Sequence, residues 1–345
     1  MLPLHLNKTR PGWEFEIPPG ASWFPAVLEI SGPLEYHGAS LMAEFGLIGT
    51  ITSDRILYDD GRFFRMLGGV LYQAAVLCGL DENVRLFSNC GQDMRGEVES
   101  LTADWATLKR EGLCFIAGPG HVVELRYSEL AREREEILRS SVPPLDPAPL
   151  LAGRSEPDML LLVFNSGFDI RIDDWRRVRA RAYCPVWMDI HSLALAKRVG
   201  VHRDYVPLPE WREWAAGVHY LQANRQEVAC MIGRPERWAD GGEIELFARD
   251  AFGLGVQAVF VTMGKDGVLV LTPAETRMIT APAAEVVVDT TGCGDVFCAA
   301  AMRELVRGAP VFEAAARGVT LASRAVAWAG LRQTFERAGL PAGQS

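Results

Sequence analysis

Residues 285–305 read EVVVDTTGCGDVFCAAAMREL, and this stretch decides the fold that we expect for the whole chain. A β-branched run comes first, a glycine loop follows, and an alanine-rich helical stretch comes last, so the expected order is strand, loop, helix. Gly292 and Gly294 let successive backbone N–H groups point at one spot, to which the helix adds its partial positive end. The stretch therefore predicts an anion-binding loop at Gly292, Cys293 and Gly294, with Asp295 in the first helical turn beside it.

A purely structural role for these residues is the alternative. Aspartate is favoured at helix N-termini and glycine in any tight turn, so Asp295 could be a helix cap and the glycines could only turn the chain. The residues of this segment leave the two interpretations equally open.

The surrounding sequence predicts an α/β fold with a mostly parallel central sheet covered by helices, because β-branched runs alternate with amphipathic stretches from about residue 45 onward. Expected strands begin at residues 45, 84, 159, 185, 218 and 258, and expected helices cover 68–79, 173–182, 243–253 and 312–329. A long connection rich in charge and proline, from residue 131 to 149, is interpreted as a solvated helix and a loop.

Composition limits the possible partners. The chain has 345 residues and a formal net charge of -9, which disfavours nucleic acid as a partner. Its longest apolar runs are strand-sized, and its start lacks the pattern of a secretory signal, so we expect a cytoplasmic protein without a membrane span. Its seven cysteines show no metal-ligand spacing and are expected to be reduced. Small molecules are the expected partners.

Several motifs resemble those of the ribokinase-like, or phosphofructokinase-B-type, carbohydrate kinases. DTTGCGD at 289–295 closely matches the DTxGAGD signature of that family, and GTITSD at 49–54 looks like its first-strand motif. Residues 67–96 are similar to its first signature, NRQE at 224–227 to its NxxE motif, and VFVTMGKDGVLV at 259–270 to the strand and turn beside the nucleotide. The matches follow the family's order over roughly residues 45–330.

The resemblance implies a ribokinase-like three-layer α/β/α sandwich with a small β-sheet lid. It places the kinase domain at 45–330, after an irregular extension (1–44) and before a C-terminal tail (331–345), with lid strands near 50–66 and 112–128. HVVELRYS at 121–128 alternates in polarity as a half-exposed strand does, which fits that lid. In some relatives the lid is also a dimer surface, so a homodimer is a further alternative.

The resemblance also assigns roles to residues of this chain. Asp295 would be the general base, in an anion hole formed by Gly292, Cys293 and Gly294. The residues expected to bind the acceptor are Asp54, Gly68, Gly69 and Gln73. Those expected to bind ATP are Asn224, Thr262, Gly264 and Gly267. Glu227 would act on Mg²⁺ through water, and Asp289 with Thr291 would lie near a monovalent cation, with K⁺ as the candidate.

Gln73 stands where many sugar kinases have asparagine, and Cys293 stands where alanine is usual, which could make the loop sensitive to oxidation. His191, after an expected strand, could contact a ligand, although a hydrogen-bonded structural histidine is the favoured interpretation.

The motifs together favour an ATP-dependent phosphotransferase that acts on an alcohol group of a sugar or polyol. A nucleoside kinase is the first alternative, since Tyr72, Trp187 and Trp211 could stack a base. A non-catalytic relative that serves as a binding or scaffold protein is the second.

Overall fold

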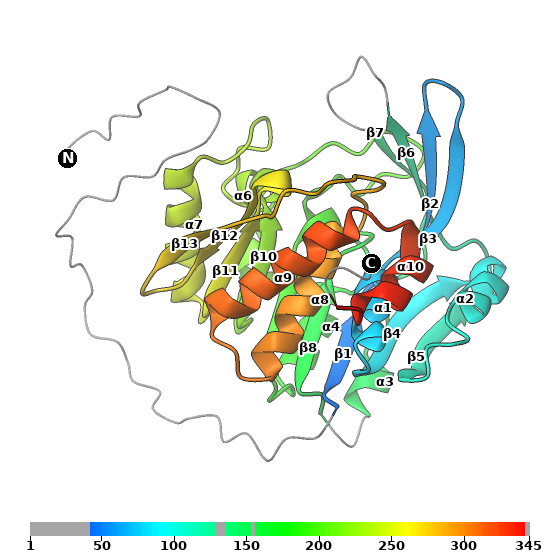
Figure 1. Ribbon diagram of the computed structural model, residues 1–345, viewed down its shortest axis with the longest axis horizontal. Coiled ribbons are helices and arrows are strands. Elements are labelled where there is room, and N and C mark those ends of the chain that lie inside the picture. Colours follow the sequence, from blue (N-terminus) through cyan, green and yellow to red (C-terminus); the bar gives the residue numbers. More distant parts are fainter. Residues whose placement is uncertain (1–41, 128–134, 153–155, 342–345) are drawn as a thin grey trace. The chain divides into compact units, whose positions relative to one another are not determined.

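The protein is described by a computed structural model that covers residues 42–127, 135–152 and 156–341. One large sheet runs through this part of the chain (Figure 1). In spatial order its strands are β13 (Thr276–Thr280), β12 (Gly267–Leu271), β11 (Ala258–Thr262), β10 (Tyr220–Asn224), β9 (Val186–Asp189), β8 (Met159–Val163), β1 (Glu44–Ile48), β4 (Asn83–Gly91) and β5 (Leu108–Ile116). All neighbours pair in parallel from β11 to β5, and only β12 and β13 run antiparallel to their neighbours.

Helices cover both faces of this sheet. One layer holds α1 (Leu71–Gly79), α8 (Cys293–Val306), α9 (Val311–Ala325) and α10 (Gly330–Ala338), and the other holds α4 (Ile172–Arg179), α5 (Trp211–Ala215), α6 (Arg225–Met231) and α7 (Gly241–Gly253). Strand β8, MLLLV, is apolar throughout because both of its faces are buried. Leu161 and Val163 enter the core on the side of α1 and α8, whereas Leu160 and Leu162 enter the core on the side of α4 to α7. The expected three-layer α/β/α architecture is confirmed.

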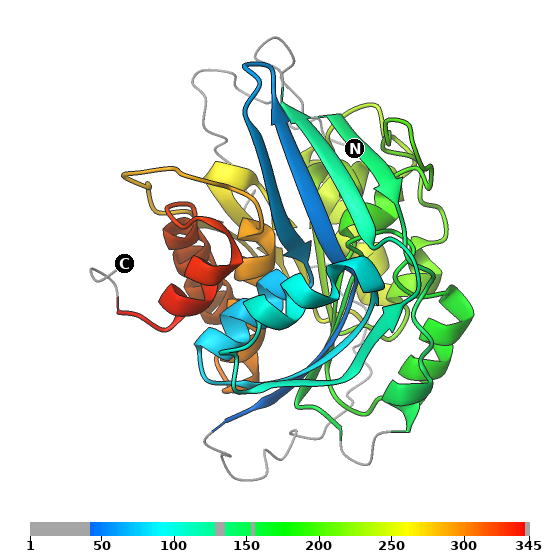
Figure 2. The same ribbon diagram turned by 90° about the vertical axis from the view of Figure 1, so that its right-hand side faces the viewer.

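A second, smaller sheet stands beside the large one (Figure 2). Its order is β3 (Phe63–Gly69), β2 (Ile51–Tyr58), β6 (His121–Tyr127) and β7 (Glu135–Ser140), and we call it the small sheet. A cluster of buried apolar side chains, namely Ile56, Val123, Leu125 and Leu138, lies on one of its faces. Strand β2 follows β1 after two residues, so the chain passes directly from the large sheet into the small one.

Several expected boundaries were wrong. Residues 285–289 are not a strand, because β13 ends at Thr280 and Val286, Val287 and Val288 are exposed without a neighbouring strand. The charged stretch after 131 is not a helix where it is described, since residues 135–140 form β7, which pairs antiparallel with β6. Residues 112–116 belong to β5 of the large sheet rather than to the lid.

The chain's ends differ from expectation in extent. Residues 330–338 form α10, which packs on α1, so an ordered helix occupies much of the expected C-terminal tail. The expected N-terminal extension falls almost wholly outside the described residues, and β1 already begins at Glu44. Two shorter helices, α2 (Arg95–Leu101) and α3 (Ala148–Leu151), complete the set within the described chain. None of its helices is long and apolar enough to cross a membrane.

Arg203 joins the small sheet to the loops at the edge of the large sheet. Its side chain is completely buried, and its guanidinium donates to the carbonyls of Ser166 (3.1 Å), Ser192 (3.3 Å) and Ala196 (3.1 Å). It also lies 3.4 Å from the carboxylate of Glu136 in β7, while its backbone N–H donates to the Glu136 carbonyl at 2.9 Å. One cation thus connects three loop carbonyls with the edge strand of the small sheet.

We therefore expect Arg203→Met to destabilise the protein by about 3 kcal/mol or more, because the change leaves buried carbonyls and the partly buried Glu136 carboxylate without this donor. Urea unfolding measures the effect. Arg203→Lys is the matched control, since it keeps the charge and part of the hydrogen bonding, and it should lose less. An Arg203→Met midpoint equal to that of the wild type would show that Arg203 does not connect the two parts.

Candidate active site

A cavity lies between the small sheet and the carboxyl edge of the large sheet. Its residues come from the ends of β8, β9, β10 and β11, from all four strands of the small sheet, from α1 and α6, and from the first turn of α8 with the loop before it. The described polar residues that line it are Thr52, Asp54, Tyr72, Glu136, Asn165, Asp189, His191, Ser192, Gln222, Asn224, Glu227, Thr262, Thr290, Thr291, Cys293 and Asp295. The carboxyl edge of a parallel sheet is the usual place for a ligand site in α/β proteins.

The glycine loop forms one wall of this cavity. Gly292 has a φ of +77°, a left-handed conformation, and a Cβ built on it would lie 2.5 Å from the ring of Tyr72. No other residue type fits this position without strain or displacement of Tyr72. Helix α8 starts at the next residue, Cys293, so its N-terminal turn lies at the cavity wall, as expected for an anion site.

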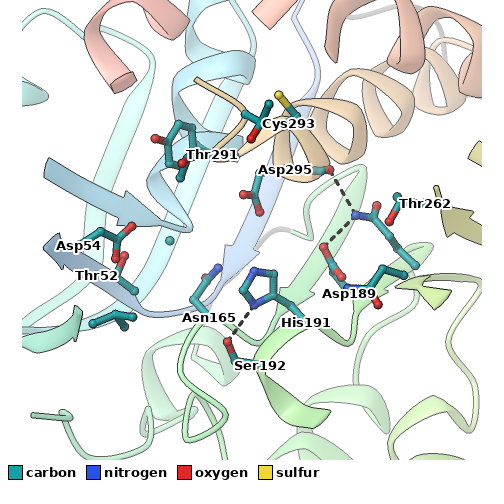
Figure 3. Close-up of a pocket in the computed structure, with 18 of the residues that line it drawn as sticks. Thr52, Asp54, Asn165, Asp189, His191, Ser192, Thr262, Thr291, Cys293 and Asp295 are labelled. Carbon is teal, nitrogen blue, oxygen red and sulfur yellow. Dashed lines mark hydrogen bonds between the residues drawn. The ribbon is translucent and has the colours of Figure 1, made fainter. Parts of the chain in front are cut away.

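Asp295 lies in that first turn, and its side chain points into the cavity (Figure 3). The residue is 8% exposed. The pKa of its carboxyl group is raised to about 7, chiefly by burial and also by the negative charges of Asp54 and Glu227, although the hydrogen bond from Gln73 lowers it. A carboxyl group that titrates near neutral pH inside a cavity is suited to accepting a proton.

Gln73 holds this carboxylate from the opposite helix. It lies in α1, is completely buried, and its Nε2 donates a hydrogen bond to Asp295 Oδ1. Gln73 is absent from the described cavity wall, so in this structure it contacts the acid rather than the space for an acceptor. The longer amide at this position therefore positions the Asp295 side chain.

Asp54 lies on β2 and faces the same cavity from the small sheet. The paired glycines opposite make this placement possible: a Cβ on Gly68 would lie 2.5 Å from Asp54 Oδ2, and Gly69, with a φ of +65°, lines the cavity itself. Asp54 is 8% exposed, and its charge acts on the pKa of Asp295. The structure thus brings together the two carboxylates that the motifs indicated.

Asn224 and Glu227 combine a structural and a functional position. Asn224 caps α6: its Oδ1 accepts from the N–H groups of Gln226 (2.8 Å) and Glu227 (2.9 Å), and Glu227 accepts from Asn224 N at 2.7 Å. This capping box explains the NxxE spacing by helix geometry alone. Glu227 is nevertheless only 5% exposed and lines the cavity with Asn224, so the pair is no solvated helix start.

Asp189 adds a further buried acid that the sequence reasoning did not identify. It ends β9, and its Oδ2 accepts from Gln222 Nε2 at 2.9 Å, while the same amide donates to the Gly294 carbonyl at 3.2 Å. Burial raises the pKa of Asp189 well above its ordinary value, with the charges of Glu227 and Asp295 as further causes. Gln222 therefore connects Asp189 to the first turn of α8.

The remaining expected site residues are spread around this centre. Thr262, at the end of β11, and Thr291 line the cavity. Gly264 and Gly267, both with positive φ, form the turn into β12 outside the described cavity wall. Asp289 accepts a hydrogen bond from Thr291 N at 2.8 Å and so shapes the loop before Gly292.

Asn165 is a further cavity residue that could have been found by extending the strand argument to β8. Asn165 and His191, the latter already considered from the sequence, follow the carboxyl ends of β8 and β9, where side chains converge on the same edge. Asp169 holds the first of these loops, since its carboxylate accepts from the N–H groups of Thr50, Asn165, Ser166 and Gly167. His191 has a φ of +34°, which is rare outside glycine and marks a strained position in the cavity wall.

Some side chains differ from their expected roles. Trp187 and Trp211 are 0% and 1% exposed in the two cores, so neither can stack on a base, and only Tyr72 of the three aromatics lines the cavity. Burial raises the pKa of the Cys293 thiol to about 12, with the charges of Asp289 and Asp295 adding to the effect. Because the thiolate is the reactive form, the expected oxidation sensitivity of Cys293 is not supported.

Comparison with known proteins relates this geometry to a family. Residues 185–337 match the family model described as pfkB family carbohydrate kinase. A 1-phosphofructokinase of Haloferax volcanii is 37% identical over 124 residues, which are 35% of this chain. The match spans only 38% of the length of that relative.

Solved structures extend the likeness to most of the chain. A pyrophosphate-dependent kinase in the ribokinase family, solved as a sulfate complex, has a TM-score of 0.71 at 16% identity and covers 86% of this chain and 100% of its own. The ribokinase of Arabidopsis thaliana, complexed with ribose and ATP, has a TM-score of 0.68 at 20% identity over 85% of this chain and 95% of its own. The resemblance carried by the sequence motifs is thus confirmed: the chain matches the pfkB carbohydrate kinases over residues 185–337, and its fold is that of the ribokinase family.

Proposed function

We propose that the protein is an ATP-dependent kinase that phosphorylates an alcohol group of a sugar or polyol. The observation that carries the proposal is the buried Asp295 carboxyl at the N-terminus of α8. Gln73 in α1 orients this carboxyl, which lines the same cavity as Asp54. An acceptor hydroxyl between the two carboxylates would donate its proton to Asp295 while the anion hole at Gly292–Gly294 receives the phosphates.

The acidity of Asp295 decides when the proton moves. Its pKa of about 7 lies about nine pKa units below that of an alcohol, taken near 16 as for water, and this gap corresponds to about 12 kcal/mol. Deprotonation before phosphoryl transfer would therefore be far too costly. The proton passes to Asp295 as the phosphorus–oxygen bond forms, which matches a reaction dominated by positioning and charge stabilisation.

The donor phosphates would need a metal ion. No lysine or arginine is among the described residues that line the cavity, whereas Asp189 and Glu227 lie there as buried acids. Among the described residues no three ligands are arranged to hold a metal alone, so Mg²⁺ would be held jointly by the phosphates and, through water, by Glu227. Bound there, Mg²⁺ would neutralise charge on the transferred group.

ATP and inorganic pyrophosphate are the two donors to compare, since one solved structure with this fold is a complex with ATP and another is that of a pyrophosphate-dependent kinase. Asp289 and Thr291 stay candidate neighbours of K⁺, although their hydrogen bond to each other already accounts for the loop. The nucleoside alternative loses its two tryptophans, which are buried in the cores. The scaffold alternative offers no reason for keeping Asp295 in a costly buried position.

Asp295→Asn should lower kcat about 10² to 10⁴-fold and leave ATP binding unchanged, because the amide cannot accept the alcohol proton. The measurement is release of ADP, or of phosphate from pyrophosphate, with a panel of sugars, polyols and nucleosides. Turnover of one acceptor class by the wild type, with loss of that turnover in Asp295→Asn, would establish both the reaction and the base. Equal turnover by the variant would remove Asp295 from the chemistry.

The same substitution should stabilise the protein, and more so at alkaline pH. Because the pKa of Asp295 is raised from 3.8 to about 7 on folding, the native state binds the extra proton, and its stability falls as pH rises through that interval. The full cost is on the order of 4 kcal/mol above pH 7. We expect the difference in Tm between Asp295→Asn and wild type to grow from pH 5 to pH 8; a constant difference would contradict the raised pKa.

The substitution Glu227→Gln separates the two roles of this residue, which are to cap helix α6 and to act on Mg²⁺ through water. Glutamine at this position keeps the capping hydrogen bond from Asn224 N but not the second one, from Asn224 Nδ2, so stability should fall by only about 1 kcal/mol, while the Mg²⁺ concentration for half-maximal activity should rise about tenfold or more. Glu227→Ala is the control and should lose both. Unchanged Mg²⁺ dependence in Glu227→Gln would limit this residue to capping.

A further inference from the structure

We infer that Gln222, together with Asp189, positions the proposed base Asp295 by fixing the backbone of the first turn of α8. The inference rests on the proposed function and deepens it, because it concerns the same carboxylate. Gln73 holds the side chain of Asp295 from α1, whereas Gln222 holds its backbone from strand β10 of the large sheet. Asp295 is thus fixed from two sides.

The large sheet brings Gln222 and Asp189 together. The two residues are register partners in the parallel pair of β10 and β9, and they are 3% and 4% exposed. Gln222 Nε2 donates to Asp189 Oδ2 at 2.9 Å, and the backbone N–H of Ile190 donates to the Gln222 carbonyl at 3.1 Å. Strand pairing therefore sets the distance between the two side chains.

The loop after β9 holds the Asp189 carboxylate in place. The backbone N–H of His191 donates to this carboxylate, which makes an Asx-turn, a turn in which the side chain binds the N–H two residues further on. His191 has its strained φ of +34° at this turn. Asp189 is therefore a fixed acceptor for Gln222.

The orientation of the Gln222 amide follows from its two partners. Its Nε2 also donates to the Gly294 carbonyl at 3.2 Å, and Figure 3 draws both hydrogen bonds as dashed lines on the Asp189 side of the cavity. A carbonyl can only accept, so a reversed amide would place Oε1 against Gly294. Oε1 consequently points away and is buried without a partner among the described residues. Because such an oxygen is unfavourable, this orientation serves Asp189 and Gly294 rather than the glutamine itself.

The bond to Gly294 acts directly on Asp295. The Gly294 carbonyl and the Asp295 N–H belong to one planar peptide unit, so fixing the carbonyl also fixes that N–H. Burial raises the pKa of Asp295, and its own backbone N–H is one of the groups that lower it. Outside its own helix, a Cβ on Gly294 would meet only Gln222 Nε2 among the described atoms, at 3.8 Å. Packing does little to hold this peptide, and the hydrogen bond from Gln222 holds it.

The substitution Gln222→Met tests the role in turnover, because methionine has the same length but donates no hydrogen bond. We expect kcat to fall about 10 to 100-fold, with a change of less than about threefold in the KM of the acceptor. In an Asp295→Asn background the same substitution should lower the residual kcat by less than about threefold, since no base is left to position. An equal fall in both backgrounds overturns the inference.

A titration of Asp295 tests the positioning without any turnover. The carboxyl carbon of Asp295 is followed by ¹³C NMR with and without Gln222→Met, both in an Asp189→Asn background, so that residue 189 carries no charge. Asp54 and Glu227, the other acids that act on Asp295, are the same in both proteins. We expect Gln222→Met to raise the pKa of Asp295 by about 0.5 unit or more, because the N–H is no longer held toward the carboxylate.

The titration separates this inference from the proposed function. An unchanged or lower pKa of Asp295 overturns the positioning role, whether or not the protein turns over any acceptor. A raised pKa in a protein without turnover would support the positioning role and refute the kinase.

Thr334→Val is the matched control. Thr334 is 3% exposed in α10, outside the described cavity lining, and its Oγ1 donates to the Gly330 carbonyl at 3.0 Å. Its substitution also removes a buried hydrogen bond to the backbone but should change neither kcat nor the pKa of Asp295. A fall in kcat equal to that of Gln222→Met would show that general destabilisation is the cause.

Gln222→Asn carries the test if Gln222→Met does not fold. It keeps the amide but is one methylene group shorter, so it cannot reach both acceptors, and its kcat should lie between those of wild type and Gln222→Met. A wild-type kcat in a folded Gln222→Asn protein would contradict the inference.

Discussion

The burial of the Asp295 carboxylate at the N-terminus of α8 is the constraint on which the rest of the site depends. A buried carboxylate is costly unless hydrogen bonds and a favourable dipole compensate it, and here Gln73 supplies the hydrogen bond while the first turn of α8 supplies the dipole. These two elements must therefore keep a fixed distance. Helices α1 and α8 pack against each other in the same core to satisfy that requirement.

The compensation is incomplete, and this has a chemical meaning. Burial keeps the pKa of Asp295 raised, and the negative charges of Asp54 and Glu227 add to the effect; burial acts in the same way on the pKa of Asp189, with Glu227 and Asp295 as the added charges. Such a group of acids is poorly stable by itself and favours cations and hydrogen-bond donors. The proposed reaction brings both, as a metal ion on the donor phosphates and as hydroxyl groups on the acceptor.

Several residues of the site also hold the fold together, which explains why a structural interpretation of each motif looked equally good. Asn224 and Glu227 close a capping box and line the cavity at the same time. Gly68 gives room to the Asp54 carboxylate, and Gly292 gives room to the Tyr72 ring. Local chemistry could not separate the two roles, because one geometry serves both.

The sequence by itself determined the layers of the fold and the glycine loop. Strand β8 is buried on both faces, so it is a continuous apolar run that is visible without knowledge of its neighbours. Asp54, Asp295, Asn224 and Glu227 were singled out because the short motifs that contain them resemble those of the kinase family.

Only the tertiary structure decided which distant side chains complete the cavity. Glu136 lies in a charged edge strand whose pattern resembles a solvated helix, and its position depends on pairing with β6 and on the buried Arg203. Gln73 was expected to bind the acceptor substrate, yet the packing of α1 on α8 turns its side chain toward Asp295. Trp187 and Trp211 looked available to a ligand but fill the cores. In each case the outcome depends on contacts between segments far apart in the chain, which no local pattern records.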